Sequence, residues 1–393
     1  MLWMYIILIA VIALLLTAEY AFHLKNVKAI PIRIHINGTR GKSSITRLIA
    51  GALREHGIRT FAKTTGTLPR MIMADGKEYP VYRPARANII EQLRIISIAS
   101  KNRAQALVIE CMALQPRLQS LTALKFVRAT HGVITNTRPD HLDIMGPSEQ
   151  DVVMAILGTT PLHGKLFTAE LDYLPEFRHV CEDRKCELFV TRGSEVTAVS
   201  DEEMSRFGYV EHKENVALVL NLCENLGIPR DTALRGMWKS KPDPGAMSEY
   251  VIDFFGRKIV FINGFAANDP ESSQRIWQMA IEHHSAFSRR IMVINSRSDR
   301  PDRSIQLAEA LKTWPEAYRY VLMGTGVYIL LRTAVSRGME PSKFLYAEGM
   351  PVSRIFEEII GLADKSAMVM GIGNIAGQGL ELVNYFENRA TLL

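Results

Sequence analysis

Eight consecutive residues have the composition of a phosphate-binding loop: Asn37-Gly38-Thr39-Arg40-Gly41-Lys42-Ser43-Ser44. Its glycines let the backbone curl until N–H groups point at phosphate oxygens, and a following helix would add the positive end of its dipole. Lys42 would reach the β- and γ-phosphates, and the Ser43 hydroxyl would bind Mg²⁺. The usual spacing has its first glycine where this chain has Ile36, so the loop is a variant. We predict that residues 38–44 bind a nucleotide; the alternative is a chance Gly-Lys-Ser at a helix start.

Two further polar groups follow apolar runs that have the pattern of buried strands. Glu110 ends the run Leu107–Glu110, and Asp140 and His141 come shortly after the run that ends at Asn136. The carboxyl ends of parallel strands share one edge, where doubly wound sheets bind ligands. A carboxylate and an imidazole there would hold Mg²⁺, which uses few protein ligands. We predict Glu110 and His141 as metal ligands; the alternatives are a strand-end salt bridge and an ordinary loop histidine.

The surrounding segments alternate between strand and helix patterns. The predicted strands are 30–36, 59–63, 107–110 and 132–136, and then, after a turn-rich break at 242–245, 259–263, 291–295, 320–323 and 368–371. Amphipathic helices are predicted at 44–56 and 88–101. Strands that alternate with helices favour a parallel sheet covered on both faces, so the predicted fold class is α/β.

The first segment, Leu2 to Ala18, contains no charged residue and would span about 26 Å as a helix. Basic residues are absent before it and present after it, at Lys25, Lys28 and Arg33. A cleaved signal peptide would have the opposite arrangement. The positive-inside rule then predicts a single membrane span with everything after residue 23 in the cytoplasm. The alternative is a buried core helix.

Composition narrows the class of protein. The 393 residues are 47% hydrophobic and 22% charged, which is typical of a globular protein and excludes a disordered or collagen-like chain. A net charge of +6 is too small for its length to require a nucleic-acid partner. Four cysteines without a zinc-like spacing exclude a disulfide scaffold and argue against a structural metal site.

Together the motifs resemble the Mur ligase family, which includes the peptidoglycan amino-acid ligases and folylpolyglutamate synthase. Within it, the chain is similar to the ligase subunits of bacterial poly-γ-glutamate synthases, which act in capsule biosynthesis. The strings that carry this resemblance are INGTRGKSS (36–44), KTTGT (63–67), ECMA (110–113), DHLDIMGP (140–147), PDPGAM (242–247), NGFAANDP (263–270) and GIGN (371–374).

The resemblance implies three parts. They are a transmembrane anchor (1–23), a P-loop ATP-binding central domain with a parallel sheet (28–247) and a smaller Rossmann-like α/β domain (250–393). It also implies an ATP- and Mg²⁺-dependent amide ligase. Such an enzyme phosphorylates a carboxylate, and an amine then attacks the acyl phosphate. The central domain follows the anchor directly, so we expect no nucleotide-sugar-binding domain and no nucleotide-sugar substrate.

Residue by residue, the resemblance assigns catalysis to Lys42, Glu110 and His141, and the metal to Ser43, Glu110 and His141. It places Asn215 beside the adenine, although a helix cap is the alternative for this residue.

Asn268 and Asp269 correspond to the part of the C-terminal domain that closes on the nucleotide. Two features depart from the family. The stretch 151–157 lacks the lysine that is carbamoylated in the peptidoglycan ligases, and the family's Gly-Arg before the last domain appears as Asp243-Pro-Gly-Ala246.

Three arginines close together in the sequence could bind an acidic substrate. Arg297, Arg300 and Arg303 follow a predicted strand, and guanidinium groups bind carboxylates through two parallel hydrogen bonds. A solvated charged loop is the alternative. Thr65 and Thr67 end another strand, where their hydroxyls would contact phosphate or the growing chain, unless they form an ordinary turn.

The overall hypothesis is a cell-membrane ligase with cytoplasmic domains that joins glutamate to the terminal carboxylate of poly-γ-glutamate. By resemblance its partners would be membrane synthase or export subunits, and no nucleic acid. Two alternatives stay open: a folylpolyglutamate-synthase-like ligase that adds an amino acid to a small acceptor, and a membrane-tethered regulatory P-loop ATPase.

Overall fold

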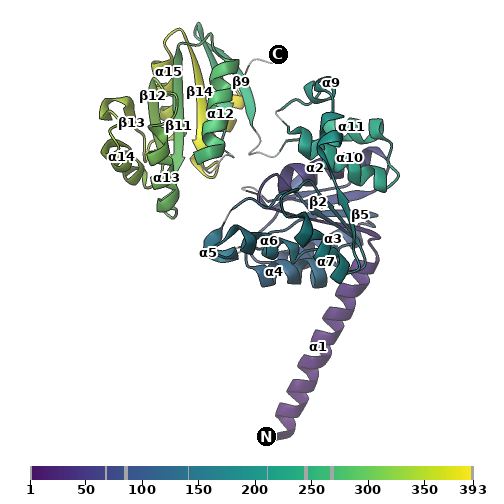
Figure 1. Ribbon diagram of the computed structural model, residues 1–393. Helices are drawn as coiled ribbons and strands as arrows, with labels where there is room; N and C mark the ends of the chain where they lie inside the picture. Colours follow the sequence, from purple (N-terminus) through teal and green to yellow (C-terminus); the bar gives the residue numbers. More distant parts are fainter. Residues whose placement is uncertain are drawn as a thin grey trace. The chain divides into compact units, whose positions relative to one another are not determined.

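A computed structural model describes residues 2–66, 69–83, 87–139, 141–209, 211–242, 247–265 and 270–390 (Figure 1). The chain divides into two compact units, residues 1–243 and residues 244–393. We call them the first and the second unit and describe each by itself.

The first unit contains one mixed sheet and most of the helices. Its strands are β1 (Ile32–Asn37), β2 (Thr60–Lys63), β3 (Arg70–Ile72), β4 (Glu78–Pro80), β5 (Ala106–Glu110), β6 (His131–Ile134), β7 (Lys165–Thr168) and β8 (Glu187–Val190). Its helices are α1 (Leu2–Lys28), α2 (Lys42–Glu55), α3 (Glu91–Lys101), α4 (Pro116–Leu121), the π-helix η1 (Thr122–Val127), α5 (Leu142–Met145), α6 (Glu149–Leu157), α7 (Leu174–Asp183), α8 (Gly193–Thr197), α9 (Asp201–Ser205), α10 (Lys213–Asn225) and α11 (Arg230–Trp238).

The strand order in this sheet is β4-β3-β2-β5-β1-β6-β7-β8. Neighbours from β2 to β8 are parallel, and β3 and β4 extend one side as antiparallel strands. The register pairs Ile36 of β1 with Glu110 of β5 and Asn37 with Ile134 of β6. The ends of β5 and β6 therefore flank the loop that follows β1.

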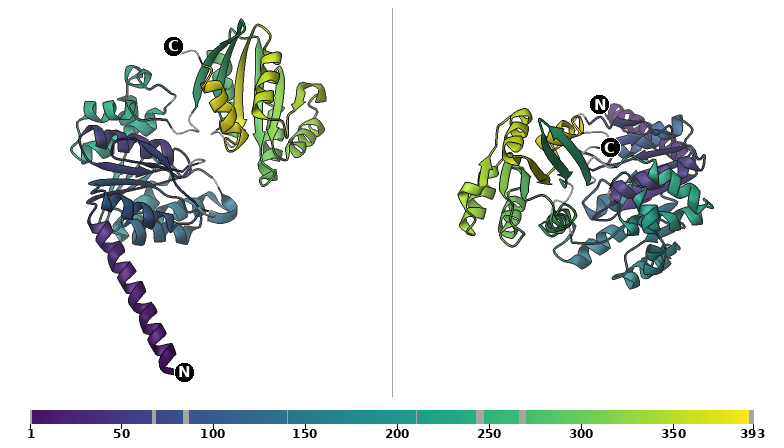
Figure 2. Two further views of the ribbon diagram at one scale, coloured as in Figure 1. Left: turned by 180° about the vertical axis from the view of Figure 1, so that it is seen from behind. Right: turned by 90° about the horizontal axis from the view of Figure 1, so that it is seen from above.

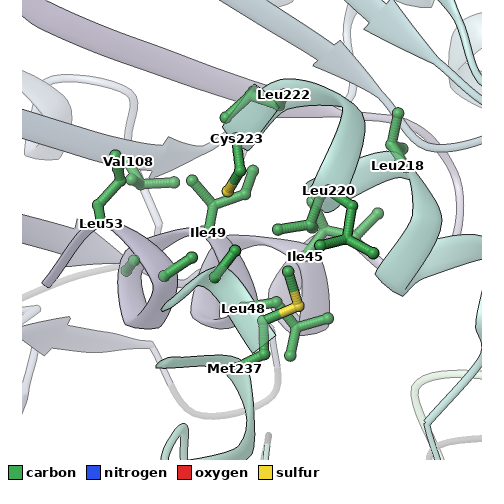
Figure 3. Close-up of a cluster of buried hydrophobic side chains, with 14 of the residues drawn as sticks. Ile45, Leu48, Ile49, Leu53, Val108, Leu218, Leu220, Leu222, Cys223 and Met237 are labelled. Carbon is green, nitrogen blue, oxygen red and sulfur yellow. The ribbon is translucent and has the colours of Figure 1, made fainter. Parts of the chain in front are cut away.

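Apolar side chains cover both faces of this sheet because successive strand residues point to opposite sides. Val108 faces α2 and α10, where Ile49, Leu53 and Cys223 form the core drawn in Figure 3. Its neighbours Leu107 and Ile109 lie in a separate cluster with residues of α3. Helices on both faces leave only the edges of the sheet for polar loops.

Helix α1 extends from the first unit (Figure 1; Figure 2, left). It has 27 residues and is long and apolar enough to cross a membrane, and none of its most apolar stretch is buried. Only its last turns are packed, with Asn26 and Val27 buried. The helix ends at Lys28, five residues beyond the predicted boundary at residue 23.

The second unit is a six-stranded sheet with helices on both faces. Its strands are β9 (Ser248–Phe254), β10 (Arg257–Asn263), β11 (Arg289–Ser296), β12 (Arg319–Gly324), β13 (Phe344–Tyr346) and β14 (Ser366–Gly373), in the order β13-β12-β11-β14-β10-β9. Its helices are α12 (Pro270–His283), α13 (Pro301–Leu311), α14 (Val327–Ser336), the 3₁₀ turn η2 (Pro341–Lys343), α15 (Val352–Ala363) and α16 (Gln378–Glu387). Only β9 is antiparallel to its neighbour among these described strands.

The α/β fold class is confirmed, and each predicted strand has a counterpart in the structure. The strands that sequence patterns did not predict are β3, β4, β7, β8, β9 and β13. Five of them have three or four residues, which is too short to display a periodicity. The sixth, β9, is an antiparallel edge strand.

Candidate active site

The phosphate loop joins β1 to α2, and its two glycines adopt backbone conformations that other residues rarely take. Gly38 has φ 131°, and a Cβ there would lie 2.1 Å from Oγ1 of Thr135. Gly41 is left-handed, with φ 78°, and is the N-cap of α2, which has no side-chain cap. The first-turn N–H groups of α2 are therefore not used by a capping side chain, and they are suited to an anion.

The two residues that follow β6 hold this loop in its curled shape. Oδ1 of Asn136 accepts hydrogen bonds from the Thr39 hydroxyl (2.6 Å) and the Arg40 N–H (3.1 Å). The Asn136 amide and the Thr135 hydroxyl both donate to the Arg40 carbonyl, at 3.2 and 2.6 Å. Sequence reasoning did not assign Thr135 and Asn136 to the site. The signal was present, because Asn136 ends the predicted strand that precedes His141.

Lys42 folds back over the loop that it follows. Its Nζ donates to the carbonyls of Gly38 (2.5 Å) and Thr39 (3.3 Å). The ammonium group therefore lies inside the curl of the backbone, where a phosphate chain would pass. Ser44, the next predicted residue after Ser43, is partly exposed in the first turn of α2.

Ser43 and Glu110 meet directly. The Ser43 hydroxyl donates to Oε2 of Glu110 at 2.8 Å, and the backbone N–H of Thr65 donates to the same oxygen at 2.7 Å. Glu110 is 2% exposed, at the end of β5. A hydroxyl and a carboxylate oxygen side by side are the hard donors that Mg²⁺ prefers, so these residues fit a divalent cation.

Buried polar groups lie around the end of β5 that carries Glu110. Gln92 donates to its carbonyl at 3.0 Å. On the neighbouring strand, Lys63 is fully buried and pairs with Glu91 at 2.5 Å, while Arg83 binds the same carboxylate through two hydrogen bonds. Burial lowers the pKa of Lys63, and Glu91 opposes that shift. Burial would raise the pKa of Glu91, but its hydrogen bonds to Arg83 and Lys63 keep that pKa below its ordinary value.

Asn215 lies beside the phosphate loop. Its Oδ1 is 3.3 Å from where a Cβ on Gly41 would stand, and its amide donates to Glu211 at 2.8 Å. The N-cap of α10 is His212, and Asn215 occupies the helix's first turn, so the cap interpretation is wrong. The predicted role at the adenine stays a prediction.

His141 starts α5 in a left-handed conformation with φ 50°, on the connection that leaves β6. Its carbonyl accepts hydrogen bonds from Ile144 and Met145, both at 2.9 Å. The same connection carries Asn136, which holds the phosphate loop. Metal binding by His141 stays a prediction.

Four candidate site residues named from the sequence lie outside the described residues: Thr67, Asp140, Asn268 and Asp269. Thr65 is described, and its hydroxyl donates to the Cys111 carbonyl at 3.4 Å. Burial raises the pKa of the Cys111 thiol to about 11, which suits a packing role.

The three arginines of the second unit line one small hollow with Asn295, Ser304 and Gly373. Arg297 is paired with Asp299 at 2.6 Å, and Arg300 is the N-cap of α13. Substrate binding by Arg297, Arg300 and Arg303 stays a prediction. Elsewhere in this unit, Glu249, His283 and His284 bring possible metal-ligand atoms within 4.8 Å of one another.

Comparison with known proteins follows the same division of the chain. Residues 36–221 match the Mur ligase middle domain, and residues 249–389 match the poly-γ-glutamate synthase CapB C-terminal domain. The PGA synthase CapB of Bacillus subtilis (strain 168) is 34% identical over 383 residues, covering 97% of this chain and 96% of that protein. The chain belongs to the CapB family of Mur ligases. It is therefore an ATP-dependent amide ligase, as the resemblance implied.

A capsule biosynthesis protein CapB of Bacillus anthracis is 37% identical over 369 residues, covering 93% of this chain and 78% of the relative. Among solved structures, Mycobacterium tuberculosis folylpolyglutamate synthase complexed with ADP has a TM-score of 0.72 at 16% identity, over 95% of this chain and 94% of that one. A bifunctional folylpolyglutamate synthase/dihydrofolate synthase from Yersinia pestis, complexed with AMPPNP and Mn ion, has a TM-score of 0.69 at 14% identity, over 94% and 92%. At these identities the structural likeness supports the fold alone.

Proposed function

We propose that this ligase makes poly-γ-glutamate by phosphorylating the polymer's terminal carboxylate and joining it to the amine of the next glutamate. The observation that carries the proposal is the contact of Ser43 with Glu110 beside a lysine-bearing phosphate loop. Its support from relatives is the PGA synthase CapB of Bacillus subtilis, to which this chain is similar over almost its whole length.

The chemistry explains why such a site is needed. A carboxylate resists attack by an amine because its leaving group would be oxide. In the proposed reaction, a carboxylate oxygen attacks the γ-phosphorus and ADP leaves. The amine nitrogen then attacks the carbonyl carbon, phosphate leaves with that oxygen, and the amine loses a proton. Negative charge grows on phosphoryl and carbonyl oxygens, so the site requires fixed positive groups more than a protein nucleophile.

Each group has a role that follows from its position in the site. The N–H groups of the phosphate loop and the first turn of α2 bind the phosphates, and Lys42 neutralises charge on the group in transfer. Ser43, Glu110 and His141 would hold a divalent cation, which we assign as Mg²⁺. When bound, this ion would offset the negative charge of the phosphates. A bound Mn ion in the Yersinia pestis relative supports a divalent cation of this kind.

Membrane attachment completes the proposal. Helix α1 is long and apolar enough to cross a bilayer once, which would leave both units in the cytoplasm with ATP. A ligase fixed at the membrane would deliver its acidic polymer to export subunits. We propose that such subunits, together with glutamate and the polymer, are its partners.

Isotope transfer tests the mechanism. Membranes containing the protein receive ATP, glutamate and short poly-γ-glutamate with ¹⁸O in its carboxylates. Each amide formed should release one phosphate that contains one ¹⁸O atom, and a Lys42→Ala variant should release none. Phosphate without ¹⁸O would contradict phosphorylation of the polymer's carboxylate. Single addition to a small acceptor would favour a folylpolyglutamate-synthase-like activity, and ATP turnover independent of glutamate would favour a regulatory ATPase.

A further inference from the structure

Helix α1 leaves the first unit at the edge opposite the phosphate loop. It ends at Lys28, four residues before β1 begins, whereas the loop follows the end of β1. The strands β1, β2, β5, β6, β7 and β8 are parallel, so all of them begin at the edge from which α1 extends (Figure 2, left). We call this the amino edge. It is separated from the phosphate loop by about 20 Å, the length of a six-residue strand.

The connections at the amino edge are basic. Exposed lysine or arginine side chains precede five of these six parallel strands: Lys25 and Lys28 before β1, Arg59 before β2, Lys101 and Arg103 before β5, Lys125 and Arg128 before β6, and Lys185 before β8. An exposed histidine, His163, precedes β7. The segments 25–31, 56–59, 101–105, 125–130 and 161–164 contain no acidic residue. Among the connections that precede these parallel strands, acidic residues occur only in the last, where Glu182, Asp183 and Glu187 surround Lys185. The turn between β3 and β4 brings one more acidic residue to this edge, because Asp75 lines one hollow with Arg59 and Asn102.

Four of these basic residues hold a backbone conformation that favours glycine. Arg103, Arg128, His163 and Lys185 have φ between 48° and 55°, in the left-handed region. They are four of the seven non-glycine residues with positive φ in the described part of the chain. Bulky side chains are disfavoured in this conformation, so four such residues at one edge are unusual.

Other helices of this chain end in the same way and show which residue that ending usually carries. Helices α3 and α7 end with the same pattern of backbone hydrogen bonds as α2, α10 and α14. The left-handed position is Gly57, Gly227 and Gly338 in the latter three helices, but Arg103 and Lys185 in the former two. Glycine therefore fits this helix ending, and two endings at the amino edge carry a basic side chain instead.

The base of α1 is tied to this edge. The Arg33 guanidinium donates to the carbonyls of Ile30 (2.5 Å) and Val27 (3.4 Å), and also to that of Arg128 (3.0 Å). His23 contacts Phe126 of η1 edge-to-face, with ring centroids 6.4 Å apart. The last turn of α1 and the connection before β6 are therefore held together.

We propose that the amino edge rests on the anionic surface of the membrane that α1 enters. This inference depends on the membrane attachment proposed above. Basic side chains near an anionic lipid surface are attracted to it over about a Debye length. The attraction would fix the first unit on its anchor so that the phosphate loop, Ser43 and Glu110 face away from the lipid, toward cytoplasmic ATP and glutamate.

A pair of labels on one strand tests the orientation. Leu162 and Leu171 are 55% and 49% exposed and flank β7 at its amino and carboxyl ends. The full chain, with Cys186→Ser to remove the partly exposed native thiol, receives a fluorophore at Leu162→Cys or at Leu171→Cys. Each protein is reconstituted in vesicles that contain a lipid with a nitroxide in its headgroup. The vesicles are phosphatidylcholine alone or with added phosphatidylglycerol.

We expect the label at position 162 to be quenched several-fold more in the anionic vesicles, with high salt removing the difference, and the label at position 171 to be quenched in neither. An Arg103→Gly/Arg128→Gly variant should lose this quenching while its melting temperature rises, because glycine relieves both left-handed positions. The matched Arg103→Lys/Arg128→Lys variant should keep it. Glutamate-dependent ATP turnover in detergent should be equal in all of these proteins.

Each negative result of the quenching and extraction experiments contradicts a different part of the proposal. If the wild-type chain stays in the vesicles after alkaline extraction but the label at position 162 ignores lipid charge, this inference alone is overturned. If alkali extracts the chain, the membrane attachment fails and the inference fails with it. Binding of the charged edge to a protein would leave quenching unaffected by phosphatidylglycerol, and that result also overturns it.

Discussion

Among individual residues, Glu110 is held from two sides. Ser43 and Thr65 both donate to one of its carboxylate oxygens, and these three residues come from α2, the end of β2 and the end of β5. The two donors fix the position of the carboxylate oxygen that a metal ion would contact. Lys42 faces into the phosphate loop, and Asn136 fixes the shape of that loop.

Replacing Glu110 with glutamine should disable the proposed metal site without disturbing the fold. The amide keeps the shape but loses the charge that attracts a divalent cation. We expect glutamate-dependent ATP turnover to fall about 10²-fold and to need more Mg²⁺ for half of its maximum. A titration of turnover against Mg²⁺ measures both effects. Glu187→Gln, at the first residue of β8, is the control and should behave as wild type. Equal Mg²⁺ dependence in the two variants would contradict the assignment.

Replacing Asn136 with alanine should loosen the phosphate loop. The change removes the hydrogen bonds to Thr39 and Arg40, so the loop loses its curled geometry in part. We expect the dissociation constant for ATP to rise about tenfold, equivalent to about 1.4 kcal/mol. Calorimetric titration with a non-hydrolysable ATP analogue measures it. Asn221→Ala removes comparable hydrogen bonds to Thr191 and Glu195 elsewhere in the unit. If that variant weakens ATP binding equally, the effect is not specific to the loop.

Among the secondary-structure elements, the order of the strands in the sheet decides which residues surround the phosphate loop. Strand β1 lies between β5 and β6, so the loop after β1 receives Glu110 from one side and Asn136 from the other. Central strands of this kind are covered on both faces, and the last four residues of β1 are all buried. His35 is the unusual member of this strand, because it is 1% exposed and neither of its ring nitrogens has a hydrogen-bond partner.

His35 should make the first unit sensitive to acid. Burial, with a smaller contribution from Lys63, lowers the pKa of His35 to about 3. The unfolded chain binds a proton near pH 6.5 and the folded chain does not, so stability is full above pH 6.5 and is lost as the pH falls toward 3. Between pH 7 and pH 5 the loss is about 2 kcal/mol.

A His35→Leu variant should remove this part of the pH dependence. Urea unfolding at pH 7 and pH 5 gives the free energies to compare. His131 will keep some acid sensitivity in the variant, because burial first, then Lys165 and Arg33, lowers its pKa to about 4. His56→Gln, at an exposed residue, is the matched control and should lose as much stability as wild type between the two pH values. An unchanged difference in His35→Leu would contradict the explanation.

At the scale of the whole molecule, each unit has its own apolar core. Among the described residues, the buried clusters of each unit contain residues of that unit only. Two separate cores imply that each unit unfolds cooperatively by itself.

Core substitutions should therefore act on one unfolding transition each. Ile49→Ala, in the cluster of Figure 3, should destabilise the first unit by about 3 kcal/mol and lower only the transition that ATP raises. Phe356→Ala removes a buried ring of the second unit and should lower only the other transition. Scanning calorimetry with and without ATP and Mg²⁺ measures both. A single transition that both variants shift equally would contradict independent cores.

The sequence by itself determined what depends on neighbours along the chain. The glycines and lysine of the phosphate loop, the apolar stretch of α1 and the alternation that gives an α/β fold are local patterns, and each has its counterpart in the structure. Glu110 could also be predicted, because the carboxyl ends of parallel strands lie at the edge of the sheet where ligands bind.

Only the tertiary structure decided which distant residues meet. Asn136 reaches the phosphate loop because β6 pairs with β1, and Thr65 reaches Glu110 because β2 pairs with β5. The basic amino edge likewise collects residues from separate connections. Strand order is set by the packing of whole helices and strands against one another, so no spacing within the chain encodes these contacts.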